Sequence, residues 1–212
     1  MRSEANPTKQ DILQASPRMF ENPILDRLSR VHPSVPVVVY GPLILVLLVL
    51  SGPAGVGAML GWFLFGYLCW TLVEYWGHRI LFHYEPQGGW GARLHWMIHG
   101  VHHDHPNDPL RLVMPPLMSL PIMLIAYGVG RLIVEPPATY AALAGFMAGY
   151  LAYDMVHYAV HHVSPRSGLG RKLRRLHMLH HFQDHTRSFG VSAPWWDVVF
   201  GTAPQKPAGP AQ

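Results

Sequence analysis

The sequence is poor in cysteine and in charge. Cys69 is the single cysteine among 212 residues, so the chain cannot build a disulfide framework or a thiolate metal site. It contains no CxxCH haem-attachment motif and no glycine-rich dinucleotide fingerprint that follows a strand. Only 13% of the residues are charged, and the formal net charge of +4 gives no reason to expect nucleic acid as a partner.

The scarcity of charge leaves long uncharged stretches. Residues 31–73 contain no Asp, Glu, Lys or Arg, which is room for two membrane spans of about 20 residues each. Residues 112–130 and 136–153 are two further stretches of this kind. We therefore predict an all-α integral membrane protein with four transmembrane helices, at about 33–51, 54–76, 112–131 and 136–157. Buried core helices of a soluble protein are the alternative, and four such stretches in one short chain disfavour it.

The basic residues predict the orientation of these spans. Six of them follow the fourth span, whereas the loop before it holds only Arg131 and Glu135; the six are Arg166, Arg171, Lys172, Arg174, Arg175 and Arg187. By the positive-inside rule the Arg-rich segment is cytoplasmic, and an even number of spans places both termini on the same face. We expect the Arg171–Arg175 segment to anchor a cytosolic helical cap on anionic lipid.

Three segments are expected. Residues 1–30 have spaced apolar positions among charges, which predicts short amphipathic helices on the membrane surface or a partly ordered segment. Residues 31–202 form one membrane domain, and no cleavable signal peptide precedes it. Residues 203–212, rich in proline, glycine and alanine, are expected to be a disordered tail.

Histidine is the residue that is abundant and patterned. All but one of the fifteen histidines lie between His78 and His185. Ten of them form two pairs and two HxxHH motifs: His78 and His83; His99, His102 and His103; His157 and His161; and His177, His180 and His181. Residues three and four apart share one face of a helix, and adjacent positions are turned by about 100°. We therefore expect i and i+3 of a motif to lie together and its adjacent pair to address two different ions.

Ten imidazoles shared by two ions give five each and leave an open position for a small ligand, which predicts a dinuclear metal site. Imidazole suits iron, zinc and copper, but zinc hydrolases usually use only three protein ligands. Redox-capable iron would explain a site at the membrane surface that activates dioxygen to attack an alkyl chain, and copper stays open. Electrons must come from a separate donor.

The remaining polar residues near these motifs have weaker patterns. We expect His95, His105, His162 and His185 to be surface groups or to stand behind the ligands. Glu74 and Asp154 precede His78 and His157 by four and three residues. They could accept the outer N–H of a ligating imidazole, or they could be satisfied by water at the membrane boundary.

The motifs resemble those of the fatty acid hydroxylase superfamily of membrane di-metal oxygenases, and within it the fatty acid 2-hydroxylases. The similarity covers about residues 70–202. Its motifs include Glu74-Tyr75 with His78-Arg79, His99-Gly100-x-His102-His103, Tyr153-Asp154-x-x-His157, His177-x-x-His180-His181-Phe182, Phe189-Gly190 and Trp196-Asp197 with Phe200-Gly201-Thr202.

This resemblance implies two iron ions, which zinc may replace in isolated protein, held by the same ten histidines. It also implies hydroxylation by dioxygen of a long acyl chain, as a fatty acid or a sphingolipid-like amide, at the carbon next to the carbonyl. Relatives from animals and fungi carry an N-terminal haem-binding donor domain, which we do not expect in this chain. A separate b-type cytochrome or ferredoxin-like protein is therefore expected to supply electrons.

Other activities stay open at this point. A desaturase, or a sterol or carotenoid hydroxylase, would use the same di-metal architecture. A non-catalytic metal transporter or sensor would place its ligands at the membrane midplane or in low-complexity histidine tracts, and the sequence has neither pattern.

Overall fold

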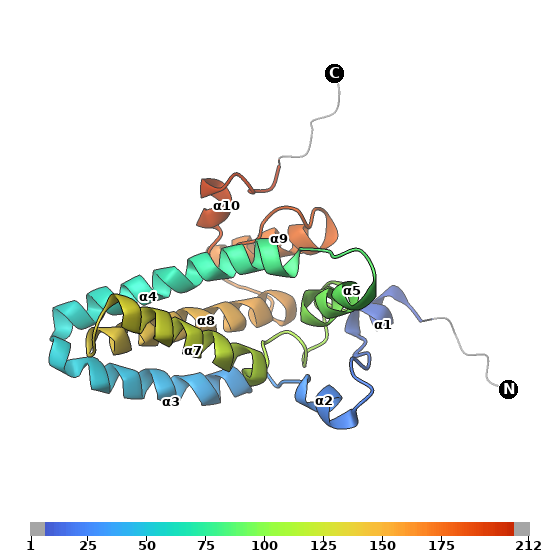
Figure 1. Ribbon diagram of the computed structural model, residues 1–212. Helices are drawn as coiled ribbons and strands as arrows, with labels where there is room; N and C mark the ends of the chain where they lie inside the picture. The colour runs from blue at the N-terminus through green and yellow to red at the C-terminus, as the bar shows by residue number, and fades with distance from the viewer. Residues whose placement is uncertain (1–6, 206–212) are drawn as a thin grey trace, which may run out of the picture.

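The computed structural model describes residues 7–205, and all regular secondary structure within them is helical. Four long helices form a bundle: α3 (Ser34–Ser51), α4 (Val56–Trp76), α7 (Pro116–Ile133) and α8 (Ala138–His162). Figure 1 shows them side by side, with short helices gathered at one end of the bundle. The all-α fold class expected from the sequence is confirmed.

Three helical segments among the described residues are long and apolar enough to cross a membrane, namely Ser34–Ala54, Val56–Phe82 and Pro116–Ile133. Their outward faces carry large hydrophobic side chains, such as Val49 with 78% and Leu132 with 88% of their surface exposed. Apolar surface of this extent is characteristic of contact with a membrane or partner rather than with water. The protein is therefore an integral membrane protein.

Helix α8 differs from the other three long helices. Its 25 residues suffice in length, but it is not among the segments apolar enough to be recognised as a span. It contacts α3, α4 and α7, and its buried residues include Thr139, Asp154 and two histidines. Because its neighbours shield much of its surface from lipid, α8 does not need the apolar composition of a helix that lipid surrounds.

The helix ends differ from the expected boundaries by more than two residues in two places. Helix α7 begins at Pro116 rather than at residue 112 because Pro115 is extended, and Leu112 and Val113 are buried in the loop before it. Helix α8 continues to His162, five residues beyond the expected 157. Between α3 and α4 the chain turns through the 3₁₀ segment η1 (Gly52–Ala54) and Gly55, whose φ of 79° favours glycine.

Two glycines let α4 and α8 approach closely. A Cβ atom on Gly66 would lie 1.8 Å from the carbonyl oxygen of Ala142, and one on Gly145 would lie 1.8 Å from that of Phe63. Small residues at a helix crossing allow the backbones to touch, as is common in membrane proteins. Nearer the cap, the Trp70 ring packs edge-on against Tyr150 at a centroid distance of 5.1 Å.

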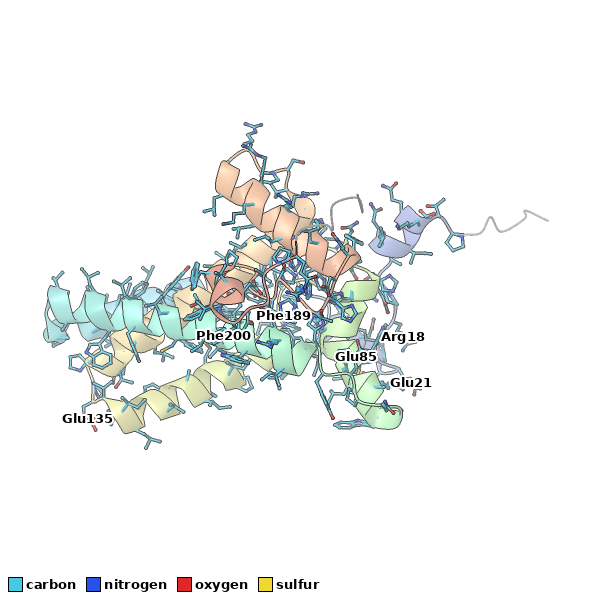
Figure 2. The ribbon with its side chains drawn as sticks, turned by 90° about the horizontal axis from the view of Figure 1, so that it is seen from above. Arg18, Glu21, Glu85, Glu135, Phe189 and Phe200 are labelled. Carbon is cyan, nitrogen blue, oxygen red and sulfur yellow. The ribbon has the colours of Figure 1, made fainter. Side chains whose placement is uncertain are left out.

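The cap is built from short helices that follow the spans. Helix α4 passes into the π-helical turn η2 (Gly77–Phe82). Then come α5 (Gly89–His95), the π-helical turn η3 (Trp96–Gly100), α6 (Val101–Asp104), α9 (Gly168–Phe182) and α10 (Trp195–Val199). Figure 2 places Glu135, in the α7–α8 loop, at one end of the molecule, and Arg18, Glu21 and Glu85 toward the other. The histidine motifs belong to the cap end.

The amino-terminal segment packs against the cap. It forms α1 (Lys9–Gln14) and α2 (Pro23–Leu28), so residues 7–30 contain two short helices. Asp26 accepts hydrogen bonds from Arg30 and Arg111, each at 3.2 Å, and the Asn107 N–H donates to the carbonyl of Leu13. Residues 206–212 of the expected disordered tail lie outside the described residues.

Candidate metal centre

Ten histidines converge at the cap end in two groups of five. The first group is His78, His83, His99, His103 and His180, and the second is His102, His157, His161, His177 and His181. Within each group one ring nitrogen per residue lies within 4.8 Å of the others. A metal–imidazole bond of about 2.1 Å places opposite ligands about 4 Å apart. The spacing therefore fits one ion for each group.

Each HxxHH motif is divided between the two groups. His99 and His103 belong to the first group, while His102 belongs to the second. The other motif is divided in the opposite sense, because His180 joins the first group and its i and i+4 members join the second. On an α-helix the i+4 position is about 40° from i, whereas i+3 is about 60° away on the other side. Adjacent histidines separate as expected, but the pair that stays together is i, i+4 and not i, i+3.

The His78–His83 pair depends on a change of helix type. Residues five apart would be turned by about 140° on an α-helix. The π-helical turn η2 winds more widely and brings the two Nε2 atoms to 3.2 Å. Turns of this type are rare in proteins, and those that occur often lie at functional sites. The periodicity of an α-helix therefore does not predict that His78 and His83 lie together.

The inward nitrogens form a donor set that suits a cation. The Nε2 atoms of His99 and His103 are 3.0 Å apart, and those of His161 and His177 are 2.8 Å apart. The buried Nε2 of His180 has no hydrogen-bond partner among the described residues. A shared metal ion would satisfy these converging lone pairs, which hydrogen bonds between imidazoles satisfy only in part. The residues present therefore fit two metal ions.

Burial keeps the imidazoles of the cap neutral. Burial first, and then the neighbouring histidines, lower the pKa of His83 to about 2 and that of His103 to about 3. Burial lowers the pKa of His180 to about 4. For the same two reasons the pKa of His102 and that of His177 lie well below the ordinary histidine value. At neutral pH these groups carry the lone pairs that metal binding requires.

Backbone carbonyls orient two of the rings. The Nδ1–H of His78 donates to the carbonyl of Phe189 at 2.6 Å, and that of His180 donates to the carbonyl of Arg187 at 2.7 Å. A hydrogen bond at Nδ1 fixes the tautomer and turns the Nε2 lone pair inward. Figure 2 shows Phe189 beside the nitrogen-rich centre of the cap.

Asp197 holds the loop that supplies the Phe189 carbonyl. Its buried carboxylate accepts the N–H groups of Phe189 at 2.8 Å and Gly190 at 3.0 Å, and the hydroxyl of Thr202 at 2.8 Å. A Cβ on Gly190 would lie 2.5 Å from the carbonyl oxygen of Ala193, so this turn requires glycine. In the sequence Asp197 is 119 residues from His78 and has no spacing that predicts a role; its place behind His78 appears only in three dimensions.

Glu74 and Asp154 do not hydrogen-bond to the rings of His78 and His157, which was one of their two expected roles. The Glu74 carboxylate accepts the N–H of Ser192 at 2.8 Å and also its hydroxyl. Asp154 accepts the N–H of Met114 at 3.4 Å. Both carboxylates join a long helix to a neighbouring loop. Helical spacing placed them one turn before a histidine, but the side chains reach across to other segments.

The remaining cap histidines lie outside the two groups. The His95 ring bonds to the carbonyl of Phe82 and the His105 ring to that of Ile12, each at 2.6 Å. His162 and His185 are exposed. Their positions agree with the expectation that all four are surface or outer groups.

Two mainly apolar cavities adjoin the histidine groups. One, of about 460 Å³, is lined by His78, Tyr153 and hydrophobic residues of α4, α5 and α7. The other, of about 360 Å³, is lined by His99, His102 and His157, and Tyr153 and Met118 border both cavities. The arrangement places apolar space next to each candidate metal position.

Comparison with known proteins gives consistent matches. The family model described as fatty acid hydroxylase matches residues 62–202. Dihydroceramide fatty acyl 2-hydroxylase FAH2 of Arabidopsis thaliana is 36% identical over 194 residues, which cover 89% of this chain and 80% of that protein. Fatty acid 2-hydroxylase of Rattus norvegicus is 38% identical over 154 residues, or 71% of this chain and 41% of the rat protein.

A solved structure has the same fold. The structure described as full-length scs7p, with only the hydroxylase domain visible, superimposes with a TM-score of 0.83 and 31% identity. The match covers 91% of this chain and 74% of that chain. The long helices and the cap therefore belong to a fold that has been solved in a hydroxylase domain.

Proposed function

Because the chain belongs to the fatty acid hydroxylase family, we propose that it is a membrane-bound di-metal monooxygenase that hydroxylates a long acyl chain at carbon 2. The substrate is a fatty acid or a sphingolipid-like N-acyl chain. The observation that carries this proposal is the pair of five-histidine groups beside apolar cavities. An apolar cavity selects an alkyl chain, and nitrogen ligands suit a redox metal.

The ten histidines would hold two iron ions. The chemistry supplied by bound iron is the activation of dioxygen, with one oxygen atom inserted into a carbon–hydrogen bond and the other reduced to water. Two electrons are needed for this reaction. We propose that a separate b-type cytochrome or ferredoxin-like protein supplies them, because residues 7–205 contain no haem-attachment or dinucleotide motif.

The side chains around the histidines prepare the site. The carbonyls of Phe189 and Arg187 fix the tautomers of His78 and His180, so that both Nε2 lone pairs face the centre. Phe82 stacks on the His99 ring at a centroid distance of 4.9 Å, which limits rotation of this ring. The hydrophobic cavity walls bind the alkyl chain and exclude water from the reacting carbon.

We also propose that α8 is a fourth span and that the cap faces the cytoplasm. Four antiparallel helices bring the ends of α4 and α8 to the same side, where their histidines meet. The Arg-rich first half of α9 belongs to this cap, in agreement with the positive-inside rule.

Lipid mass spectrometry of cells that express the chain tests this function. The wild type should add one oxygen atom to acyl chains, and fragmentation should place it next to the carbonyl. His180→Ala should abolish the product and lower bound metal, whereas His162→Ala, on an exposed residue, should retain both. A loss of two hydrogens would instead indicate a desaturase, and full activity of His180→Ala would overturn the assignment of this residue.

A further inference from the structure

A second apolar cavity continues the one beside His78. It has a volume of about 380 Å³ and lies between α4, α7 and α8, farther from the cap. Val73 of α4 and Ile122 of α7 line both cavities. The two cavities are therefore adjacent, and in line they extend from the first histidine group into the part of the bundle that contains the membrane-spanning segments. We call this path the acyl groove.

We propose that the acyl groove binds the hydrocarbon chain of the substrate, and that the side chains of Ala126 and Val129 on its α7 wall leave room for the chain to extend toward Ile133. This inference rests on the proposed hydroxylase function. Val73 and Ile122 border both the far cavity and the cavity that contains His78, and this adjacency to the histidines is the observation that commits the groove to the substrate rather than to a structural lipid.

The chemistry of the groove suits a saturated chain. Beyond Val73 its wall is formed by aliphatic and aromatic side chains with small residues between them, and Thr139 is the only hydroxyl-bearing wall residue. No charged side chain lines this part. A chain of methylene groups finds the same kind of apolar contact on this wall as in lipid, whereas a polar head group would lose its hydrogen bonds there.

The length of the groove can be measured along α7. Met118 borders the cavities beside the histidines, and Ile133 lines the far part of the groove. At about 1.5 Å per residue, the 15 steps between these residues span about 22 Å. An extended chain advances about 1.3 Å per carbon for carbon–carbon bonds of about 1.5 Å. The groove therefore holds about 17 carbons, and a much longer chain would extend past its end.

Ala126 lies about halfway along this path. It is eight residues from Met118, about 12 Å along α7, and its small, half-buried side chain lines the groove. A phenyl ring here would leave room for about 9 carbons. The same ring at Val129, about 16 Å from Met118, would leave room for about 13. Leu124 is 69% exposed on the same helix and does not line the groove, so Leu124→Phe is the matched control.

The test supplies cells with an equal mixture of saturated fatty acids of 8 to 24 carbons and measures the hydroxylated products by chain length. Ala126→Phe should lower hydroxylation of chains of 16 carbons or more about tenfold relative to chains of 8, because several methylene groups lose their site. Val129→Phe should move the limit to an intermediate length, and Leu124→Phe should keep the wild-type profile. Equal loss at every length, or an unchanged profile in both groove variants, would overturn the proposal.

A second readout does not require turnover. A 16-carbon fatty acid with a photoreactive diazirine at carbon 10 should label peptides of α7 around Ala126 in the wild-type protein, and unlabelled 16-carbon fatty acid should prevent this. Labelling confined to the cap, or labelling that the competitor does not reduce, would refute the groove even if the variants do not fold. A wild type that is labelled in α7 but forms no hydroxylated product would refute the proposed function and retain the binding site.

Discussion

The crossing of α4 and α8 supports a strong prediction about stability. In Gly145→Ala the added Cβ would meet the carbonyl oxygen of Phe63 at 1.8 Å, whereas ordinary contact begins near 3.4 Å. The two backbones would have to move apart by about 1.6 Å, since neither contacting atom belongs to a flexible side chain. Overpacking of this kind costs about 1–3 kcal/mol, and we expect about 3 kcal/mol because rigid backbone cannot yield. Gly66→Ala should behave in the same way, since its Cβ would lie 1.8 Å from the carbonyl oxygen of Ala142.

Equilibrium unfolding in mixed micelles, followed by circular dichroism, measures this effect. Gly61→Ala is the matched control, because its Cβ would meet nothing within 4 Å. Alanine is the better helix former by about 1 kcal/mol, so the control should match or slightly exceed the wild type. If Gly145→Ala unfolds within about 0.5 kcal/mol of the wild type, below the usual cost of overpacking, the close approach of α4 and α8 is not a packing constraint and the reasoning fails.

Two further predictions concern the metal centre. Asp197→Asn places an amide opposite the N–H groups of Phe189 and Gly190, and the loss of a buried hydrogen-bond acceptor costs about 1–3 kcal/mol. Metal titration of this variant should show a metal affinity reduced about 10–100-fold. An affinity equal to that of the wild type would contradict the role of the loop. In metal-free protein the pKa values of about 2 for His83 and about 4 for His180 lie below the 6.5 of an unperturbed histidine. The unfolded chain therefore binds more protons below pH 6.5, and the free energy of unfolding should be constant above that pH and fall as the pH decreases toward 4. Acid titration followed by circular dichroism measures this, and a flat profile between pH 7 and 4 would contradict it.

The gathering of the ten histidines could be predicted from the sequence because their main pattern is local. The ten histidines occur at short spacings, and spacing on a helix fixes which face a side chain occupies. The division of each motif between the two histidine groups was harder to predict from the sequence. His99 shares its group with His103 rather than with His102, a choice between 40° and 60° of helical rotation that depends on how each helix is turned toward its partners.

The remaining errors come from neighbours in space. The absence of charge predicted the same environment for all four long segments. Helix α8, however, is shielded by α3, α4 and α7 and contains buried polar residues. Glu74 lies one turn before His78, yet it bonds to Ser192, which is far away in the sequence. The π-helical form of η2 is indicated in the sequence by the five-residue interval between His78 and His83, which does not match the spacing of an α-helix.

The distribution of ligands over the helices makes the two histidine groups interdependent. The end of α4 with its π turn contributes only to the first group, and α8 contributes only to the second. The HxxHH segments of η3–α6 and of α9 each contribute to both, in the proportions two to one and one to two. These two segments therefore connect the two groups, while Gly66 and Gly145 let α4 and α8, each of which leads to one histidine pair, approach closely. A change that separates α4 from α8 should thus alter the distance between the two metal ions before it removes either one.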